Sequence, residues 1–304
     1  MAINRTAINK QLQVGLNTVW GLEYNQHPEE WRRIFDVNNS KKAFEEDVLM
    51  TGFGSAVVKS EGSDVTFDTA QESWSSRYTH ETMALAFNLT QECLEDNQYM
   101  QMGQKYTRAL AKAMVSAKEI KGASVLNFGF DSGHLGGDGV ALFSASHPTV
   151  GGAVQSNLLA TPADLSETSL EDLLTQIRLA KDDRGLPIAL KAKDLIIPPN
   201  LMFTATRLLE STLRTGGNDN DVNAIKSMGF FGKAAVDITR LSDPDAWFIR
   251  TDASDGLKYF QRIAAEFKTE DDFKSGNFRS KVRERFSFGF TDWRGCFGSA
   301  GAGV

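Results

Sequence analysis

Apolar positions follow two different periods along the chain, which predicts a mixture of helices and strands. An amphipathic helix is predicted near the start, where apolar residues are spaced three or four apart: Ile8, Leu12, Leu16 and Val19. A second helix is predicted to begin at Pro28, since proline suits the first helical position. The longest predicted helix spans residues 96–121, with Lys118 and Lys121 at its negative end and Gly122 as its stop.

Period-two alternation predicts strands in the middle and near the end of the chain. Residues 78–89 are expected to form a half-buried strand with one apolar face: Met83, Leu85, Phe87 and Leu89. Alternation at 263–267 and 282–290 predicts two later strands. The segment between these regions is mixed. Strands are predicted at 125–130, 194–197 and 246–250. One helix is predicted to begin at the capping box Thr168–Glu171 and to end at Gly185, and a second follows the strand at 194–197 and runs to Leu213. The fold class is therefore α+β.

A polar hairpin is predicted at residues 54–76. Val58 on one side, and Val65 with Phe67 on the other, flank a turn at residues 61–64. The outer half is so rich in polar and small residues that neither face is expected to bury against its own domain. Such a hairpin is either solvated or laid across a neighbouring molecule.

Composition narrows the class of protein. The chain has 304 residues, of which 41% are hydrophobic, and no apolar run long enough to cross a membrane, so we expect a globular protein that stays in the cytosol where it is made. Cys93 and Cys296 are far apart without a CxxC spacing, which indicates reduced thiols. A net charge of -6 argues against a protein whose main task is to grip nucleic acid.

Motifs that carry chemistry are few. The glycines of residues 133–139 do not form a nucleotide-binding pattern, and no GxSxG nucleophile elbow occurs. His134 and Asp138 are the only pair that we name as a candidate metal or catalytic site, and a solvated glycine-rich loop is the simpler interpretation. We expect no catalytic residue, no metal and no cofactor.

The order of elements gives a more specific indication: an arm, a polar hairpin, a half-buried strand, a long helix, a mixed region and a return to strands. This order resembles the major capsid proteins of tailed bacteriophages with the Hong Kong 97-type fold. Several stretches are similar to the Mu-like head subunit group: Leu142-Phe143-Ser144, Ser146-His147-Pro148, Asn157-Leu158-Leu159, residues 164–170, 195–199, 220–224 and 245–248, and Asp292-Trp293-Arg294-Gly295 before Gly298-Ser299.

The resemblance implies a division of the chain. Residues 1–53 would be an N-terminal arm, and 54–76 the extended loop that reaches over an adjacent subunit. The peripheral domain would combine 77–122, including the spine helix, with 252–304, and the axial domain would be 123–251. Loops of the axial domain, such as 215–221, would gather at the centres of pentamers and hexamers.

The resemblance also implies self-assembly into an icosahedral shell around the phage genome. Contacts between subunits are then expected at Lys59, Glu61, Gly62, Asp64, Trp74, Arg77, Asn218, Asp219, Trp293 and Arg294. Some relatives join a loop lysine covalently to a neighbour, but nothing around Lys59 supports such a link. Expected partners are copies of the chain, a separate scaffolding protein, a portal, possible decoration proteins and packaged DNA in non-specific proximity, and no membrane.

Two alternatives stay open at this stage. A shell of the same fold can enclose protein cargo, as encapsulin-like compartments do. Purified particles that contain DNA would indicate a phage head, and particles that contain a cargo enzyme would indicate such a compartment. An α/β enzyme with an unrecognised site would be a small oligomer that loses activity on His134→Ala. A shell subunit predicts megadalton particles, and deletion of residues 61–64 should then impair assembly without unfolding the subunit.

Overall fold

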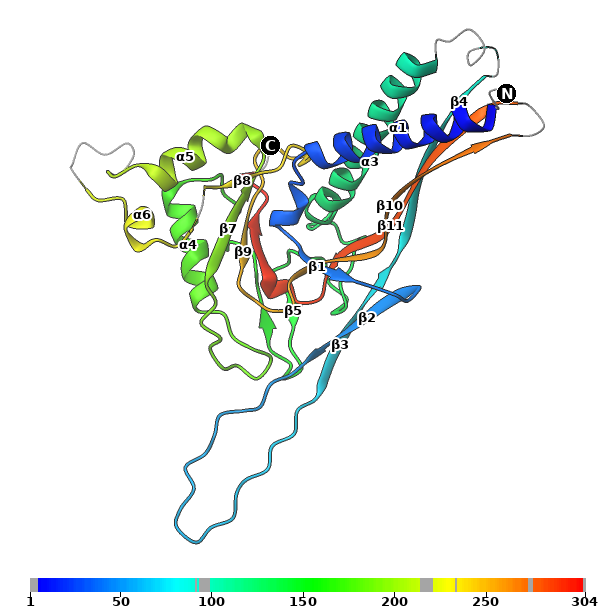
Figure 1. Ribbon diagram of the computed structural model, residues 1–304. Helices are drawn as coiled ribbons and strands as arrows, with labels where there is room; N and C mark the ends of the chain where they lie inside the picture. The colour runs from blue at the N-terminus through cyan, green and yellow to red at the C-terminus, as the bar shows by residue number, and fades with distance from the viewer. Residues whose placement is uncertain are drawn as a thin grey trace.

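The computed structural model describes residues 5–90, 92, 99–213, 221–232, 234–272 and 276–302 (Figure 1). Within these residues no helix is long and apolar enough to cross a bilayer. The helices are α1 (Arg5–Gln26), η1 (Trp31–Arg33), α3 (Tyr99–Asn127), α4 (Glu167–Arg178), η2 (Pro199–Leu201), α5 (Met202–Glu210), α6 (Ala224–Met228) and η3 (Trp293–Gly295). The strands are β1 (Asp36–Asn39), β2 (Phe44–Met50), β3 (Glu72–Thr79), β4 (Glu81–Leu89), β5 (His147–Pro148), β6 (Val154–Gln155), β7 (Ala192–Ile197), β8 (Val236–Asp237), β9 (Trp247–Thr251), β10 (Leu257–Asp271), β11 (Phe278–Phe290) and β12 (Cys296–Ser299).

A long sheet with the strand order β1-β10-β11-β4 forms one part of the molecule. Strands β10, β11 and β4 are antiparallel, and β1 pairs in parallel with the start of β10. Side chains of β11 alternate from Phe278 to Phe286, so that Phe278, Val282 and Phe286 are buried while Lys281 and Arg283 are exposed. Helices α1 and α3 pack on the apolar face of this sheet (Figure 1). The predicted strands at 263–267 and 282–290 are confirmed, and both are longer than predicted.

A second, more deeply buried sheet has the order β12-β9-β7-β8. Every residue of β9 is buried, which explains why its sequence is apolar without alternation. Helices α4 and α5 lie beside this sheet (Figure 1), and α4 buries its apolar stripe: Leu170, Leu173, Leu174 and Ile177. The largest hydrophobic cluster runs without a break from this sheet to Trp31 and Tyr259 at the long sheet. The α+β class is confirmed.

Helix α3 continues past the glycine that was expected to end it. It extends to Asn127, and Val125 to Asn127 form its last turn, so the predicted strand at 125–130 is wrong. A side chain at Gly122 would place its Cβ 3.0 Å from Cβ of Trp31. Gly122 is therefore a close-packing position, at which α3 approaches η1, and not a helix stop.

Two glycines of α3 are expected to respond to alanine in opposite directions. At Gly103 an added Cβ would make ordinary contacts, 3.6 Å from Leu16 and 3.7 Å from Leu89. Gly103→Ala should therefore raise the free energy of unfolding by about 0.5–1 kcal/mol through helix propensity. Gly122→Ala should lower it by about 1–2 kcal/mol, because Trp31 must move. Urea unfolding of both variants checks the pair, and equal effects of the same sign would contradict this assignment.

Other helix boundaries differ from the prediction because more than one nearby residue can cap the helix. Helix α4 begins after Ser166, whose hydroxyl accepts from the backbone N–H of Ser169 at 3.2 Å while the Ser169 hydroxyl accepts from the backbone N–H of Ser166 at 2.9 Å. The predicted box at Thr168 was two residues too late. Gly185 lies in a turn beyond the helix, with φ of 84°. After Pro28 only the short η1 turn forms.

A buried ion pair joins α3 to the long sheet. Nζ of Lys118 lies 2.6 Å from a carboxylate oxygen of Glu284, and both side chains are almost fully buried. The phenol of Tyr24 donates to the same carboxylate at 3.1 Å, and the Lys118 ammonium lies over the ring of Trp31 at 4.8 Å. Lys118 thus fixes α3 on the sheet, so its predicted role at a helix end is wrong.

The neighbouring Glu119 gives the fold a pH dependence. Its carboxylate accepts from the backbone N–H groups of Glu30 at 3.0 Å and Trp31 at 3.2 Å, and burial raises its pKa from 4.5 to about 7. A raised folded-state pKa adds stability that is fully present below pH 4.5 and is lost as the pH rises through 7.

The difference in stability between wild type and Glu119→Gln should therefore change with pH. Between pH 5 and pH 8 the wild type should lose about 2–3 kcal/mol relative to the variant, because only the wild type must ionise a buried carboxyl. Thermal unfolding of both proteins across this range measures the effect. Parallel curves would show that Glu119 does not titrate with a raised pKa.

Candidate assembly surfaces

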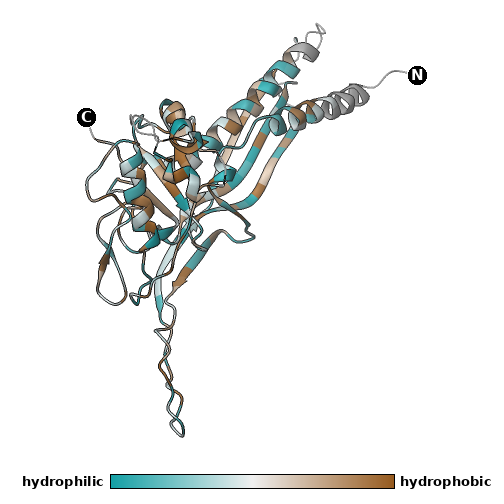
Figure 2. Cartoon of the chain, turned by 90° about the vertical axis from the view of Figure 1, so that its left-hand side faces the viewer, coloured by the Kyte–Doolittle hydropathy of each residue, from teal (hydrophilic) through white to brown (hydrophobic). Residues whose placement is uncertain are grey.

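An extended loop projects from the body between β2 and β3 (Figures 1 and 2). The two strands pair from Phe44–Thr79 to Met50–Glu72. A last rung follows at Thr51, whose backbone N–H donates to the carbonyl of Gln71 at 2.9 Å. Residues 52–71 then run out and back without a regular ladder, apart from a turn at Glu61 and Gly62. The predicted hairpin at 54–76 is thus displaced, because its strands pair at the base and not beside the turn.

One anchor near its base fixes the loop to its own subunit. The Asp68 carboxylate accepts from the backbone N–H of Gly54 at 2.7 Å and from the Arg184 guanidinium at 3.1 Å. Arg184 also donates to the backbone carbonyl of Thr69. The backbone N–H groups of Gly54 and Thr69, and then Arg184, hold the pKa of Asp68 below its usual value. The loop is therefore held in position up to this point, and beyond it only the turn provides internal bonds.

Large apolar side chains are exposed along this loop. Val58 is 93% and Phe67 is 94% solvent-accessible, and three more apolar residues are mainly exposed: Phe53, Val57 and Val65. Single exposed apolar residues are common on proteins, but five on one projecting loop are not explained by packing within the subunit. The sequence interpretation named Val58, Val65 and Phe67 as strand positions of the hairpin, but it attributed contacts between subunits to the polar residues and not to these apolar ones.

The contact residues predicted on the loop lie mostly at its surface. Lys59, Glu61, Gly62 and Asp64 are exposed at the tip, where φ of Gly62 is +80° and therefore favours glycine. In β3, the half-buried Trp74 has an indole N–H without a hydrogen-bond partner among the described residues. Arg77 is exposed, and its guanidinium lies 3.9 Å from the ring centre of Phe44.

Trp293 and Arg294, predicted as contact residues, lie inside the subunit. They are 2% and 3% exposed. The Arg294 guanidinium donates to Asp183 at 2.8 Å, to Asp292 at 3.3 Å and to the carbonyl of Lys181 at 2.9 Å. These bonds hold η3 against the turn that follows α4. Both side chains offer almost no surface to a neighbour, and we do not propose them as contacts.

Two further predicted contacts, Asn218 and Asp219, lie outside the described residues, as does most of the loop 215–221. The elements that lead to this loop do expose apolar side chains. Phe203 on α5 is 71% accessible, and Met228 at the end of α6 is 67% accessible.

The face of the long sheet that points away from α1 and α3 carries a row of cationic side chains. Alternate residues of β11 contribute to it: Arg279, Lys281, Arg283 and Arg285. Arg279 pairs with Asp272 at 2.6 Å. The sequence interpretation missed this face, although basic residues at every second position from 279 to 285 indicate it.

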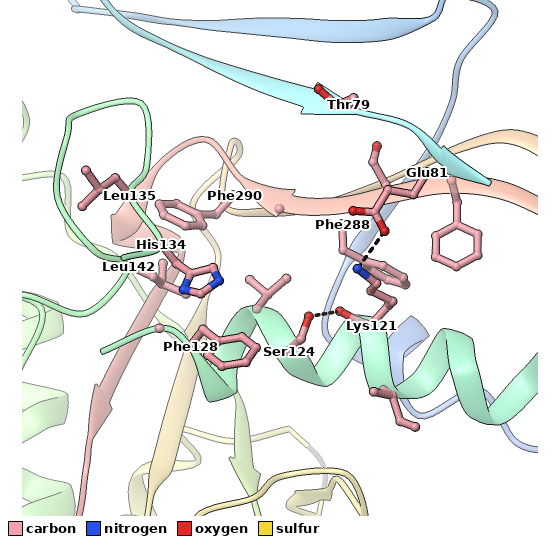
Figure 3. A pocket seen from close by; sticks show the side chains of 16 residues that line it. Thr79, Glu81, Lys121, Ser124, Phe128, His134, Leu135, Leu142, Phe288 and Phe290 are labelled. Atoms are coloured by element: carbon pink, nitrogen blue, oxygen red, sulfur yellow. Dashed lines mark hydrogen bonds and ion pairs between the residues drawn. The ribbon is translucent and has the colours of Figure 1, made fainter. Parts of the chain in front are cut away.

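A cavity of about 560 Å³ lies between the end of α3, β11 and residues 128–135 (Figure 3). At its rim, Nζ of Lys121 lies 2.7 Å from the Glu81 carboxylate. His134 stacks on Phe128, with ring centres 4.5 Å apart, and its Nδ1 lies 3.1 Å from Asp131. Aromatic and aliphatic side chains form much of the lining, and Glu81 and His134, two titratable groups of this lining, are each paired with a residue other than a serine or threonine.

His134 and Asp138, the candidate catalytic pair, have different partners. Asp138 is buried and lies 2.6 Å from Nδ1 of His147, while Nε2 of that histidine lies 3.2 Å from the Asn157 side-chain oxygen. The amide of Asn157 donates to the carbonyls of Leu142 and Cys296 at 2.7 and 3.0 Å. This network ties loops together in the interior, so the predicted pairing is wrong.

Metal and thiol chemistry find no support in the described part of the chain. No group of three histidine, cysteine, aspartate or glutamate side chains could hold a metal ion there. Cys296 is fully buried, and burial raises the pKa of its thiol far above the usual value. We therefore assign no catalytic role to Cys296.

A projecting loop with exposed apolar side chains and a sheet face with a row of basic residues favour association with other molecules. The phage capsid protein family matches residues 72–298, and the chain belongs to this family. It is a capsid shell protein with the Hong Kong 97-type fold, and thus a structural component of a phage particle. No curated protein matches the sequence.

Solved structures share this fold at low sequence identity. The procapsid protein of bacteriophage JBD30 is 17% identical with a TM-score of 0.50, and the match covers 98% of this chain and 76% of that one. A chain of Mycobacterium phage Adephagia is 10% identical with a TM-score of 0.54, at 91% coverage of both. A virus-like particle from Pyrococcus furiosus is 11% identical with a TM-score of 0.52, at 95% and 98% coverage.

Proposed function

We propose that this chain is the major head subunit that assembles into pentamers and hexamers of an icosahedral shell around a phage genome. The observation that carries the proposal is the extended loop with its five exposed apolar side chains, which the subunit itself cannot bury. Placed on an adjacent copy, each of these side chains would contribute about 1.5–3 kcal/mol of hydrophobic burial at most. Repetition over many copies then makes a stable wall from modest contacts.

The asymmetry of the subunit supports ring formation. The loop is one surface and its receiving site on the next copy must be another, so the contact is heterologous and closes into rings when the rotation between copies allows it. We assign residues 1–53 to an arm, 54–76 to the loop, 77–122 and 252–304 to a peripheral domain, and 123–251 to an axial domain. The axial loop at 215–221 would face the ring centre.

The other partners follow from the role of a genome container. A net charge of -6 suits a wall that must not hold packaged DNA tightly. A scaffolding protein, a portal and decoration proteins would act during or after assembly, and the subunit would be in the host cytoplasm before it joins a particle.

A compartment for protein cargo is the alternative with the same fold. The likeness to the Pyrococcus furiosus particle supports only the fold, whereas the family match favours a phage head. Particles purified by sedimentation and treated with nuclease separate the two: protected double-stranded DNA supports the head, and a co-purified enzyme without DNA supports the compartment. A chain that sediments only as a monomer or dimer under every assembly condition would contradict both.

A further inference from the structure

A side chain of the body reaches the extended loop beyond its paired base. One terminal nitrogen of the Arg184 guanidinium lies 3.1 and 3.3 Å from the two carboxylate oxygens of Asp68, and the other donates to the backbone carbonyl of Thr69. The same carboxylate accepts from the backbone N–H of Gly54 at 2.7 Å, which ties the returning chain of the loop to the outgoing chain. Through Asp68, a single arginine therefore holds both chains of the loop.

Arg184 projects from a turn, residues 182–186, whose own hydrogen bonds fix its shape. The Asp182 carboxylate accepts from the backbone N–H groups of Arg184 and Leu186, each at 2.8 Å. The backbone N–H of Asp182 donates to the carbonyl of Leu186 at 2.8 Å. Gly185 has φ of +84°, which only glycine adopts without strain. The position from which Arg184 extends is therefore well defined.

Contacts on the other side of this turn attach it to the interior of the subunit. The carboxylate of Asp183 is buried and lies 2.8 Å from the Arg294 guanidinium, which also donates to the carbonyl of Lys181 at 2.9 Å. Adjacent residues thus serve opposite sides of the turn, since Asp183 joins it to the core and Arg184 joins it to the loop. In Figure 1 this turn lies between α4 and β7, beside the place where the loop leaves the body.

The rest of the extended loop gains little order from packing within the subunit. Residues 52–71 lie outside any strand, and their large apolar side chains are exposed. Ordering such a segment only on binding costs conformational entropy, and a contact that orders it beforehand reduces that cost. The side chains of Arg184 and Asp68 are 28% and 40% exposed, so their contact is weak enough for the loop to adjust when a neighbour arrives.

We propose that Arg184 is a positioning residue, which sets the direction in which the extended loop leaves the subunit before a second copy is present. The inference rests on the proposed assembly into a shell and adds how the free subunit prepares its loop. The apparent affinity for the next copy falls in proportion to the fraction of subunits whose loop is correctly directed. Arg184 thus acts through Asp68 and the loop, and not through contact with the neighbour.

Distances between two spin labels in the full-length chain, below the concentration at which shells form, measure the direction of the loop. The labels are attached to Ser60→Cys at the loop tip and Glu171→Cys on α4, both exposed positions, in a chain with Cys93→Ser. We expect one narrow distance distribution, which Arg184→Ala should broaden at least about twofold, because a loop without this contact samples many directions.

Two carboxylates of the same loop provide the matched comparison. Asp68→Asn should broaden the distribution as Arg184→Ala does, whereas Asp64→Asn removes the same charge from the exposed tip and should leave the width unchanged. Arg184→Lys keeps the charge without the planar pair of donors, so its width should lie between those of wild type and Arg184→Ala. Equal broadening by Asp64→Asn would show that loop charge, and not the contact with Arg184, orders the loop.

Shell formation by the unlabelled chain measures the consequence. Arg184→Ala and Asp68→Asn should each slow it about threefold to tenfold, and the double variant should be no slower than the slower single variant, because both substitutions break one contact. The urea midpoint of Arg184→Ala should equal that of the wild type, since the bonds of the turn use only the backbone of this residue. Additive slowing in the double variant would contradict a shared contact.

The two measurements separate the positioning role from the proposed function. An unchanged distance distribution in Arg184→Ala overturns the proposal whatever happens to shells, and a broader distribution with shell formation at the wild-type rate overturns the positioning role. If the wild type forms no shells under any assembly condition, the proposed function fails, while the distances still decide whether Arg184 directs the loop.

Discussion

Replacing Val58 and Phe67 by aspartate is expected to leave the subunit folded and to reduce shell formation at least about tenfold. Both side chains are more than nine-tenths exposed in the subunit, so their loss removes no internal packing. The unfolding free energy should change by no more than about 0.5 kcal/mol, as for other surface substitutions. Sedimentation of particles and thermal unfolding of the soluble subunit measure the two effects.

The control for this experiment adds the same charge to the same loop. Ser55 and Thr66 are exposed polar residues of the loop, and Ser55→Asp with Thr66→Asp leaves the apolar side chains in place. We expect this variant to assemble within about threefold of the wild type, because rim charges have small effects on affinity. Equal loss in both variants would show that charge, and not apolar contact, governs the loop.

Arg294→Leu is expected to destabilise the subunit by about 3–5 kcal/mol. The substitution leaves Asp183 and Asp292 buried without the cation that now lies 2.8 and 3.3 Å away. Burial already raises the pKa of Asp292, against the opposing effect of Arg294. The measurement is urea unfolding in a background with Val58→Asp and Phe67→Asp, which should keep the protein from assembling.

Arg279→Leu provides the comparison. Arg279 also pairs with an aspartate, at 2.6 Å, but its side chain is 58% exposed, so its loss should cost about 1 kcal/mol or less. Shell formation is tested separately, with Arg294→Leu in the chain that keeps Val58 and Phe67. If Arg294→Leu unfolded at nearly the wild-type urea concentration and yet abolished shells in that chain, Arg294 would be a contact between subunits after all.

Long periodic segments were predictable from the sequence because their periodicity has a single physical cause. The alternation of β11 and the apolar stripe of α4 each bury one face, and only one register does so. The order of such segments also led to the capsid fold through resemblance. Neither inference needed a contact between distant residues.

The errors arose where distant residues decide the structure. Glycine is typical of the position after a helix end, but Gly122 lies within α3, where it allows the close approach of Trp31, ninety-one positions earlier in the sequence. Trp293 and Arg294 are of residue types that are common at interfaces. Arg294 is nevertheless buried, because its guanidinium donates to Asp183, which is more than one hundred residues away in the sequence. The row of basic residues at 279–285 could have been identified from its alternation alone, whereas the pairing of Arg279 with Asp272 needed the fold.

Electron microscopy of particles from cells that express this chain with the other head proteins tests the central claim most directly. We predict closed icosahedral shells built from this chain, in which residues 52–71 of each copy lie on an adjacent copy with Val58 and Phe67 buried. Shells built from another protein, or shells of this chain whose loops extend into solvent without touching a neighbour, would contradict the account.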